Sequence, residues 1–206
     1  MRKSTSPAVD WFACITDWPD LPDGATVVEV GGYEGLWATA IAQRYGARLF
    51  VFEPQEWAYQ KCIERLAGMD AKIFNYGLGD RDVTYAPMTT FRTDGATFAD
   101  REGDGESLGR VGYGHIRDIN AVWTELGWRD IDLMQVNCEG CEFKLLPYLL
   151  RLGLLSHIRR LIVQFHPYSA AERILEGELR EQISKTHRVL WAGAHTAWEA
   201  MAWGAS

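Results

Sequence analysis

The sequence has no apolar run long enough to cross a membrane as a helix. Such a helix needs about 20 consecutive apolar residues, and the most apolar stretch, 145–163, is interrupted by three arginines. The start MRKS has the basic character of a secretion signal, but Asp10 and Asp17 interrupt the apolar part and no clear cleavage site follows. The sequence therefore predicts a cytoplasmic protein without a membrane partner.

Basic residues are also in short supply. The 206 residues include 28 acidic and 21 basic side chains, which gives a net charge of −7. A phosphate backbone is bound by a basic surface, so this balance argues against a nucleic-acid partner. With 47% apolar residues the chain can bury a full core, and we expect one domain over 1–206. The oligomeric state is left open.

Cysteine is scarce and shows no metal-binding pattern. The cysteines are Cys14, Cys62, Cys138 and Cys141, and without other signs of export we expect reduced thiols. The last two have C-x-x-C spacing, but a zinc site needs about four ligands and no second pair exists. We therefore expect a packing role for this pair, with a redox pair as the alternative, and no metal site.

Strand and helix patterns alternate along most of the chain. The expected strands are 25–30, 47–54, 71–77, 131–140 and 158–167, with two closing strands at 187–193 and 196–203. The expected helices are 35–46, 56–68, 116–127, 141–153 and 169–186. Repeated strand–helix units predict an α/β, Rossmann-like fold with a mostly parallel sheet and helices on both faces.

Two segments lack this alternation. The N-terminal segment 1–24 contains only a short amphipathic stretch at 8–18, and residues 80–114 are rich in glycine and polar residues. We expect a hairpin and a mobile loop in 80–114, and we expect both segments to face the substrate.

In a parallel sheet the carboxyl ends of the strands form one rim, where ligands bind. The fold therefore predicts that Gly31–Gly35, Glu53, Asn137–Gly140 and His166 converge there.

The first strand runs into a glycine loop, VVEVGGYEG, at 27–35. A glycine turn between a strand and a helix lets a ligand approach the backbone, and the start of the helix offers free N–H groups. Glu53 ends the next strand, where a carboxylate can accept hydrogen bonds from the two hydroxyls of a ribose. Loop and acid together predict a site for an adenosine-containing cofactor.

The loop chemistry favours S-adenosyl-L-methionine over NAD. The dinucleotide pattern G-x-G-x-x-G requires glycine where this chain has Tyr33. Glu34 adds negative charge where phosphates would lie, and Glu29 suits a cationic amino-acid tail. A glycine turn that serves only strand–helix packing remains the alternative.

Several segments together resemble the FkbM-type methyltransferases, a class I family. VVEVGGYEGLWA is similar to its first motif, VFEPQ to its second, FNYGLGDRD to the segment after its third strand, IDLMQVNCEGCEFKLL to its fourth motif, and IVQFHP to its last block. The resemblance covers residues 25–167 in order, and Phe52-Glu53-Pro54 and Glu139-Gly140-x-Glu142 are its most specific parts.

The resemblance implies a class I fold with strand order 3-2-1-4-5-7-6 and an antiparallel seventh strand. It implies methyl transfer from S-adenosyl-L-methionine, with S-adenosyl-L-homocysteine as product, to a hydroxyl of a sugar, glycan or natural product. The cofactor-binding residues it implies are Glu29, Gly31, Gly32, Tyr33 and Gly35 around the methionine part, Glu53 and Pro54 at the ribose, and Gly77, Leu78 and Asp80 in a turn beside the adenine.

The chain departs from the family pattern at charged positions. Asn137 replaces the leading acid of the fourth motif, Gln135 replaces a lysine, and Gln164 replaces an acid. These neutral side chains argue against a mechanism that uses a metal. They leave room for two alternatives to the methyltransferase, an NAD-dependent oxidoreductase and a non-catalytic cofactor-binding protein.

The candidate catalytic residues are His166, Glu139 and Asn137. His166 is the candidate general base, because a neutral hydroxyl is a weak nucleophile. Glu139 is the second candidate, or it orients His166 or the substrate. The structural alternatives are that His166 ends a strand, that Glu139 caps the helix near Cys141, and that Glu142 binds the neighbouring backbone.

Overall fold

The computed structural model describes residues 11–90, 96–98, 110–192 and 198–203. Its main sheet has the strand order β10-β11-β9-β8-β1-β2-β3. The strands are β1 (Thr26–Val30), β2 (Arg48–Phe52), β3 (Ala71–Phe74), β8 (Leu133–Val136), β9 (Arg160–Gln164), β10 (His187–Ala192) and β11 (Trp198–Trp203). All neighbours pair in parallel except β11, which is antiparallel to β9 and β10. The predicted order, with its antiparallel seventh strand, is confirmed.

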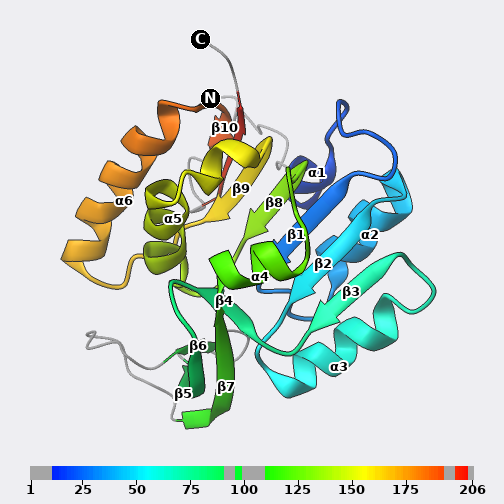
Figure 1. Ribbon diagram of the computed structural model, residues 1–206, viewed down its shortest axis with the longest axis horizontal. Helices are drawn as coiled ribbons and strands as arrows, with labels where there is room; N and C mark the ends of the chain where they lie inside the picture. Colours follow the sequence, from blue (N-terminus) through cyan, green and yellow to red (C-terminus); the bar gives the residue numbers. More distant parts are fainter. Residues whose placement is uncertain (1–10, 91–95, 99–109, 193–197, 204–206) are drawn as a thin grey trace, which may run out of the picture.

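Helices cover both faces of this sheet (Figure 1). One core joins the sheet to α1 (Trp11–Thr16), α2 (Leu36–Tyr45) and α3 (Glu56–Arg65). The other core joins it to α4 (Ile119–Glu125), α5 (Glu142–Arg151) and α6 (Ala170–Ser184), and the 3₁₀ helix η1 (Leu154–His157) adds to it.

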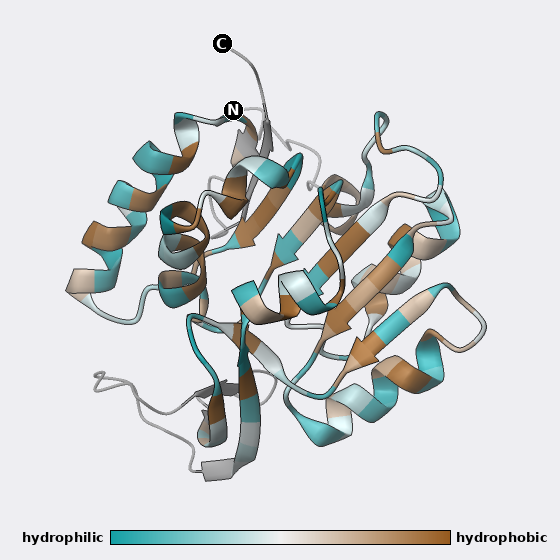
Figure 2. Ribbon diagram, in the orientation of Figure 1, coloured by the Kyte–Doolittle hydropathy of each residue, from teal (hydrophilic) through white to brown (hydrophobic). Residues whose placement is uncertain are grey.

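The central strands are apolar on both sides because both faces are covered. In β1, Val27 belongs to one core and Val28 to the other, and each has 0% of its surface exposed. Figure 2 shows the same pattern, with predominantly hydrophobic strands and hydrophilic residues along the helices. Glu29 interrupts this pattern in β1.

A second sheet, with the order β4-β7-β5-β6, forms from the segment that lacks the strand–helix alternation. Its strands are β4 (Gly77–Gly79), β5 (Val83–Thr90), β6 (Ala96–Phe98) and β7 (Arg110–Asp118). The predicted hairpin is present, since β5 pairs antiparallel with β6 and β7. The predicted mobile loop falls largely on 91–95 and 99–109, outside the described residues. Figure 1 shows this sheet on the side toward which the parallel strands of the main sheet point.

Two predicted boundaries here were wrong. The helix expected at 116–127 begins only at Ile119, because 110–118 forms β7 and the Asp118 side chain caps α4 by accepting from the Asn120 N–H. The strand expected at 71–77 ends at Phe74, and Gly77–Gly79 is a separate strand parallel to β7. The partner that makes these residues strands lies more than 30 residues away in the sequence.

The order of the main strands reverses at β1, which lies between β2 and β8. The chain leaves β1 toward β2 on one side and returns to β8 on the other. Ligands of open α/β sheets bind at this switch point. It is formed here by the loop after β1 and the loop after β8.

None of the described helices is long and apolar enough to span a bilayer.

Candidate functional site

The chain's own packing explains the glycines of the first loop. A Cβ on Gly31 would lie 1.9 Å from the carbonyl oxygen of Asn137, and a Cβ on Gly32 would lie 2.3 Å from Cγ1 of Val51. Gly35 precedes α2 with a left-handed φ of 74°, which glycine adopts without strain. The glycines therefore fit a packing role on their own. The case for a ligand rests on the acidic side chains around them.

Glu29 lies beneath this loop, and one of its oxygens lacks a partner among the described residues. Its side chain is buried, its Oε2 accepts no hydrogen bond from them, and a Cβ on Gly32 would be 3.7 Å from that oxygen. Burial, and then the nearby Glu53 carboxylate, raise the pKa of Glu29 well above its usual value. Gln135, its register partner on β8, also has a buried oxygen without a partner. An unsatisfied buried carboxylate beside a ligand loop fits a cationic or hydrogen-bond-donating ligand group.

Glu53 fixes the loop from the end of β2. Its two oxygens accept the backbone N–H groups of Tyr33 at 2.7 Å and Gln55 at 2.8 Å. Burial raises the pKa of Glu53 to about 7, although these two hydrogen bonds act in the opposite direction. Each carboxylate oxygen keeps a second lone pair, so Glu53 can still accept from a ligand. Pro54 follows it, half-buried at the rim.

Two residues of the loop after β1 contact α3. Tyr33 adopts a left-handed φ of 46°, and its ring meets Trp57 edge-on with centroids 5.3 Å apart. Glu34 forms an ion pair with Arg65 at 3.5 Å, and its carbonyl accepts from the same guanidinium. Arg65 therefore offsets part of the negative charge that Glu34 brings to the loop.

The predicted turn at 77–80 contains a strand, β4, over Gly77–Gly79. Gly77 and Leu78 pair with Ile116 and Arg117 of β7, and Leu78 is 1% exposed within the core. The Leu78 side chain packs in the core, and the place of this segment beside the adenine, through its backbone, stays a prediction. Asp80 follows β4 and is half-buried.

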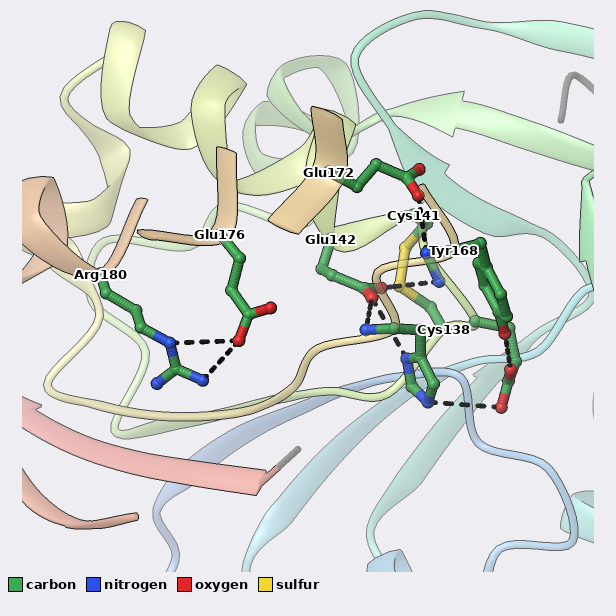
Figure 3. A network of polar contacts seen from close by, with 10 residues as sticks. Cys138, Cys141, Glu142, Tyr168, Glu172, Glu176 and Arg180 are labelled. Carbon is green, nitrogen blue, oxygen red and sulfur yellow. Dashed lines mark hydrogen bonds and ion pairs between the residues drawn. A yellow bond between two sulfur atoms is a disulfide. The ribbon is translucent and has the colours of Figure 1, made fainter. Parts of the chain in front are cut away.

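The loop after β8 contains a disulfide between Cys138 and Cys141, which corrects the expectation of reduced thiols (Figure 3). Between them, Glu139 has a φ of 52° and Gly140 a φ of 97°. A side chain such as that of Glu139 rarely adopts this left-handed conformation, and such outliers cluster at functional sites. The sulfur atoms and a Glu142 oxygen lie within 4.8 Å of one another. Because the sulfurs are bonded together, they offer no thiolate ligand in this form.

Glu142 is a buried anchor for this loop and for His166. It is 0% exposed, one oxygen accepts the Gly140 N–H at 2.8 Å, and the other accepts the His166 N–H at 2.5 Å. That second oxygen also lies 3.1 Å from Nδ1 of His166. In the tautomer with its proton on Nδ1, the ring donates to this oxygen, and Nε2 carries the lone pair. The predicted backbone-binding role of Glu142 is confirmed.

Nε2 of His166 faces Glu139, with 3.5 Å between Nε2 and Oε1. The other Glu139 oxygen accepts the hydroxyl of Tyr168 at 2.6 Å. Tyr168 is held in turn by α6, because its N–H donates to Glu172 of the Ser169–Glu172 capping box. The imidazole, the carboxylate and the phenol form one chain of groups that can hold or pass a proton.

The sequence interpretation missed Tyr168. The available signal was an ionisable hydroxyl two residues after His166, ahead of a capping box. Asn137 joins the rim through its backbone: its N–H donates to Val30 and its carbonyl packs against Gly31. The predicted convergence of the loop after β1 with Glu53 and Asn137, and of Glu139 with His166, is confirmed.

Replacing Glu29 with glutamine is expected to stabilise the ligand-free protein. The buried carboxyl must either lose its proton in an apolar site or keep it at a pH where the unfolded chain would release it. Its pKa is raised in the folded state, so this penalty is absent below the ordinary pKa and grows as the pH rises. We expect urea unfolding at pH 8 to show a gain of about 1–3 kcal/mol for Glu29→Gln, with the two proteins converging toward pH 4.5.

The control is Glu34→Gln in the same loop, which removes an ion pair that is one-third exposed and should change stability little at either pH. A loss of stability in Glu29→Gln at pH 8 would show that the carboxylate has a structural partner.

The sequence matches no protein-family model and no curated protein. Solved structures are similar in fold. A protein assigned as an rRNA methylase from Clostridium thermocellum superposes with a TM-score of 0.57 at 11% identity, over 95% of this chain and 94% of the other. The precorrin-6y C5,15-methyltransferase of Geobacter metallireducens gives 0.53 at 9% identity, over 99% and 93%. A protein assigned as an O-methyltransferase from Klebsiella pneumoniae gives 0.50 at 16% identity, over 98% and 83%. At these identities the likeness establishes the fold, which is that of the class I methyltransferases.

Proposed function

We propose that this protein transfers a methyl group from S-adenosyl-L-methionine to a hydroxyl of a sugar, glycan or natural product. The observation that carries the proposal is the pair of buried carboxyls, Glu29 and Glu53, at the loop of the switch point in a class I fold. The unpartnered Glu29 oxygen is the feature that the chain's own packing leaves unexplained.

The residues present fit this cofactor. S-adenosyl-L-methionine supplies an activated methyl group on a sulfonium, which is a good leaving group. Glu29 is suited to its ammonium group, and Glu53 to the hydroxyls of its ribose through the lone pairs that Tyr33 and Gln55 leave free. A cationic ligand would also relieve the repulsion between the two carboxyls.

The same acids disfavour NAD. A pyrophosphate carries negative charge, and here it would approach two buried carboxyls. Among the described residues, Arg65 pairs with this loop, and it is already engaged by Glu34. Glu34 is paired with Arg65, so the acids that disfavour a pyrophosphate here are Glu29 and Glu53.

The FkbM-type resemblance stays a prediction from the motifs. It supports a hydroxyl acceptor, and Glu139-Gly140-x-Glu142 gains support from the distinct contacts of both acids: Glu142 anchors the loop and Glu139 faces His166. The alternative, a non-catalytic cofactor-binding protein, would not require a proton-accepting side chain that the substrate can reach. The side chain of Glu139 is 32% exposed and that of His166 13%, so an acceptor can reach this pair.

The chain contributes alignment and proton transfer. Methyl transfer is an in-line displacement, and alignment of the reacting atoms can supply about 7–11 kcal/mol as an upper range. Glu142 orients His166 through Nδ1, so that Nε2 with Glu139 receives the hydroxyl proton. Tyr168 holds Glu139 in place.

The proposal predicts how cofactor affinity varies with pH. Calorimetry should detect binding of S-adenosyl-L-homocysteine and none of NAD. The ribose hydroxyls donate best to ionised Glu53, whose pKa is about 7 in the free protein. Affinity should therefore fall by up to about tenfold from pH 8 to pH 6. Binding of NAD in place of S-adenosyl-L-homocysteine would reject the proposal.

The acceptor class needs a separate test. Sugars and nucleotide sugars are screened as methyl acceptors with S-adenosyl-L-methionine as donor, and release of S-adenosyl-L-homocysteine is measured.

A further inference from the structure

The disulfide lies within the candidate active site. Cys138 and Cys141 close a ring around Glu139 and Gly140, between the end of β8 and the start of α5. Both cysteines are partly exposed. The remaining described cysteines are not in a disulfide: Cys14 is half-buried and Cys62 is buried. In a reducing compartment a disulfide is typically transient and either catalytic or redox-sensing.

We propose that Cys138 and Cys141 form a reversible thiol–disulfide site, and that its reduction by a dithiol releases Glu139 from its position opposite His166. The effect on methyl transfer rests on the proposed function, whereas the redox site itself does not.

The ring holds Glu139 in a conformation that its own backbone disfavours. Its φ of 52° is left-handed, and the next residue, Gly140, has a φ of 97°. The disulfide ties the residues before and after this turn. Opening the ring lets Glu139 relax to an ordinary conformation, which moves its carboxylate away from Nε2 of His166 and from the Tyr168 hydroxyl.

Reduction also reaches His166 through Glu142. Sγ of Cys138 lies 3.4 Å from the Glu142 oxygen that accepts the Gly140 N–H. The disulfide sulfur carries no proton, so it cannot donate to that carboxylate. A thiol at the same position can, and the other oxygen of this carboxylate holds His166. In the dithiol form, the Cys138 thiol can therefore donate a hydrogen bond to the Glu142 carboxylate, in competition with the Gly140 N–H. This new bond disturbs the carboxylate that holds His166.

The exchange step balances as a two-electron transfer. A thiolate of the dithiol attacks Sγ of Cys138, and the bond to Cys141 breaks. Cys141 is the better leaving thiolate, because it precedes the N-terminus of the ten-residue helix α5, while Cys138 faces a carboxylate. The second thiol of the reagent then attacks the reagent's first sulfur in the mixed disulfide. Cys138 leaves as a thiolate, and the reagent departs as a disulfide. Its two protons and two electrons end on Cys138 and Cys141.

The first test counts reactive thiols. The full chain is equilibrated in mixtures of reduced and oxidised glutathione, or in dithiothreitol. It is then alkylated with iodoacetamide, and mass spectrometry counts the alkyl groups. We expect two more alkyl groups in the reduced protein than in the oxidised one, with reversal by oxidised glutathione. Cys138→Ser with Cys141→Ser should abolish the difference, and Cys14→Ser, away from the pair, should preserve it. A wild-type pair that stays reduced in oxidised glutathione, or that dithiothreitol fails to open, overturns the proposal.

The second test follows the site itself. The imidazole NMR signals of His166, assigned with His166→Gln, should shift on reduction in the wild type and stay fixed in the double serine variant. Identical His166 signals and identical amide exchange over 138–142 in both redox states would overturn the coupling.

Activity separates this inference from the proposed function. Reduction should lower the methyl-transfer rate by about tenfold or more, since the base loses its partner, while affinity for S-adenosyl-L-homocysteine stays within about twofold. Absence of S-adenosyl-L-homocysteine binding in both redox states rejects the proposed function and leaves the redox result intact. Equal rates in both states, with the disulfide shown to open, reject the coupling alone.

Discussion

Replacing His166 with alanine is expected to lower the methyl-transfer rate by about 10²–10⁴, the usual contribution of a general base. The change removes the ring whose Nε2 faces Glu139 and whose Nδ1 is held by Glu142. Affinity for S-adenosyl-L-homocysteine should stay nearly intact, because the proposed cofactor contacts are those of Glu29 and Glu53 and not of His166. Release of S-adenosyl-L-homocysteine with an accepted hydroxyl substrate, beside calorimetry on the same protein, measures both quantities.

Two matched variants decide how the proton is shared. Glu139→Gln keeps the shape of the side chain and removes its charge, and Tyr168→Phe removes only the hydroxyl that donates to Glu139. A large loss in Glu139→Gln with a nearly normal His166→Ala would make Glu139 the base. Small effects from all three would leave alignment as the only contribution of this site.

Replacing Glu53 with alanine is expected to weaken binding of S-adenosyl-L-homocysteine by at least about 10²-fold. Hydrogen bonds to a charged group contribute about 1.5–3 kcal/mol each, and Glu53 is placed to accept from two ribose hydroxyls. The alanine also leaves the N–H groups of Tyr33 and Gln55 without their acceptor, which loosens the loop.

Glu53→Gln separates these two causes. The amide oxygen can still accept from one backbone N–H, so the loop is better preserved, while the charge and one acceptor are lost. We expect affinity between those of the wild type and the alanine variant, without the rise from pH 6 to pH 8 that the titration of Glu53 produces. Wild-type affinity in both variants would remove Glu53 from the cofactor site.

Patterns within short segments predicted much of the candidate site. The run from Glu29 to Gly35 and the acid at Glu53 each end a strand, and strand ends of a parallel sheet meet at one rim. The contacts of Gly31 with Asn137 and of Tyr33 with Glu53 follow from that rule.

Contacts between distant segments decided the features that were missed. Tyr168 reaches Glu139 only because α6 begins beside the loop after β8. Leu78 became a strand residue because β7 pairs with it, and no local pattern near Leu78 encodes that partner.

The sequence patterns determined the class of fold and the rim on which the acids and His166 lie, and the resemblance to the FkbM-type family supplied the order of the strands. Hydrophobic periodicity and glycine turns are local, and the handedness of strand–helix–strand connections leaves few arrangements. The tertiary structure alone decided which partners these groups have: Arg65 for Glu34, no described residue for one oxygen of Glu29, and a bonded Cys141 for Cys138. Charge state and reactivity depend on burial and on neighbours across the fold, and both exist only once the chain has packed.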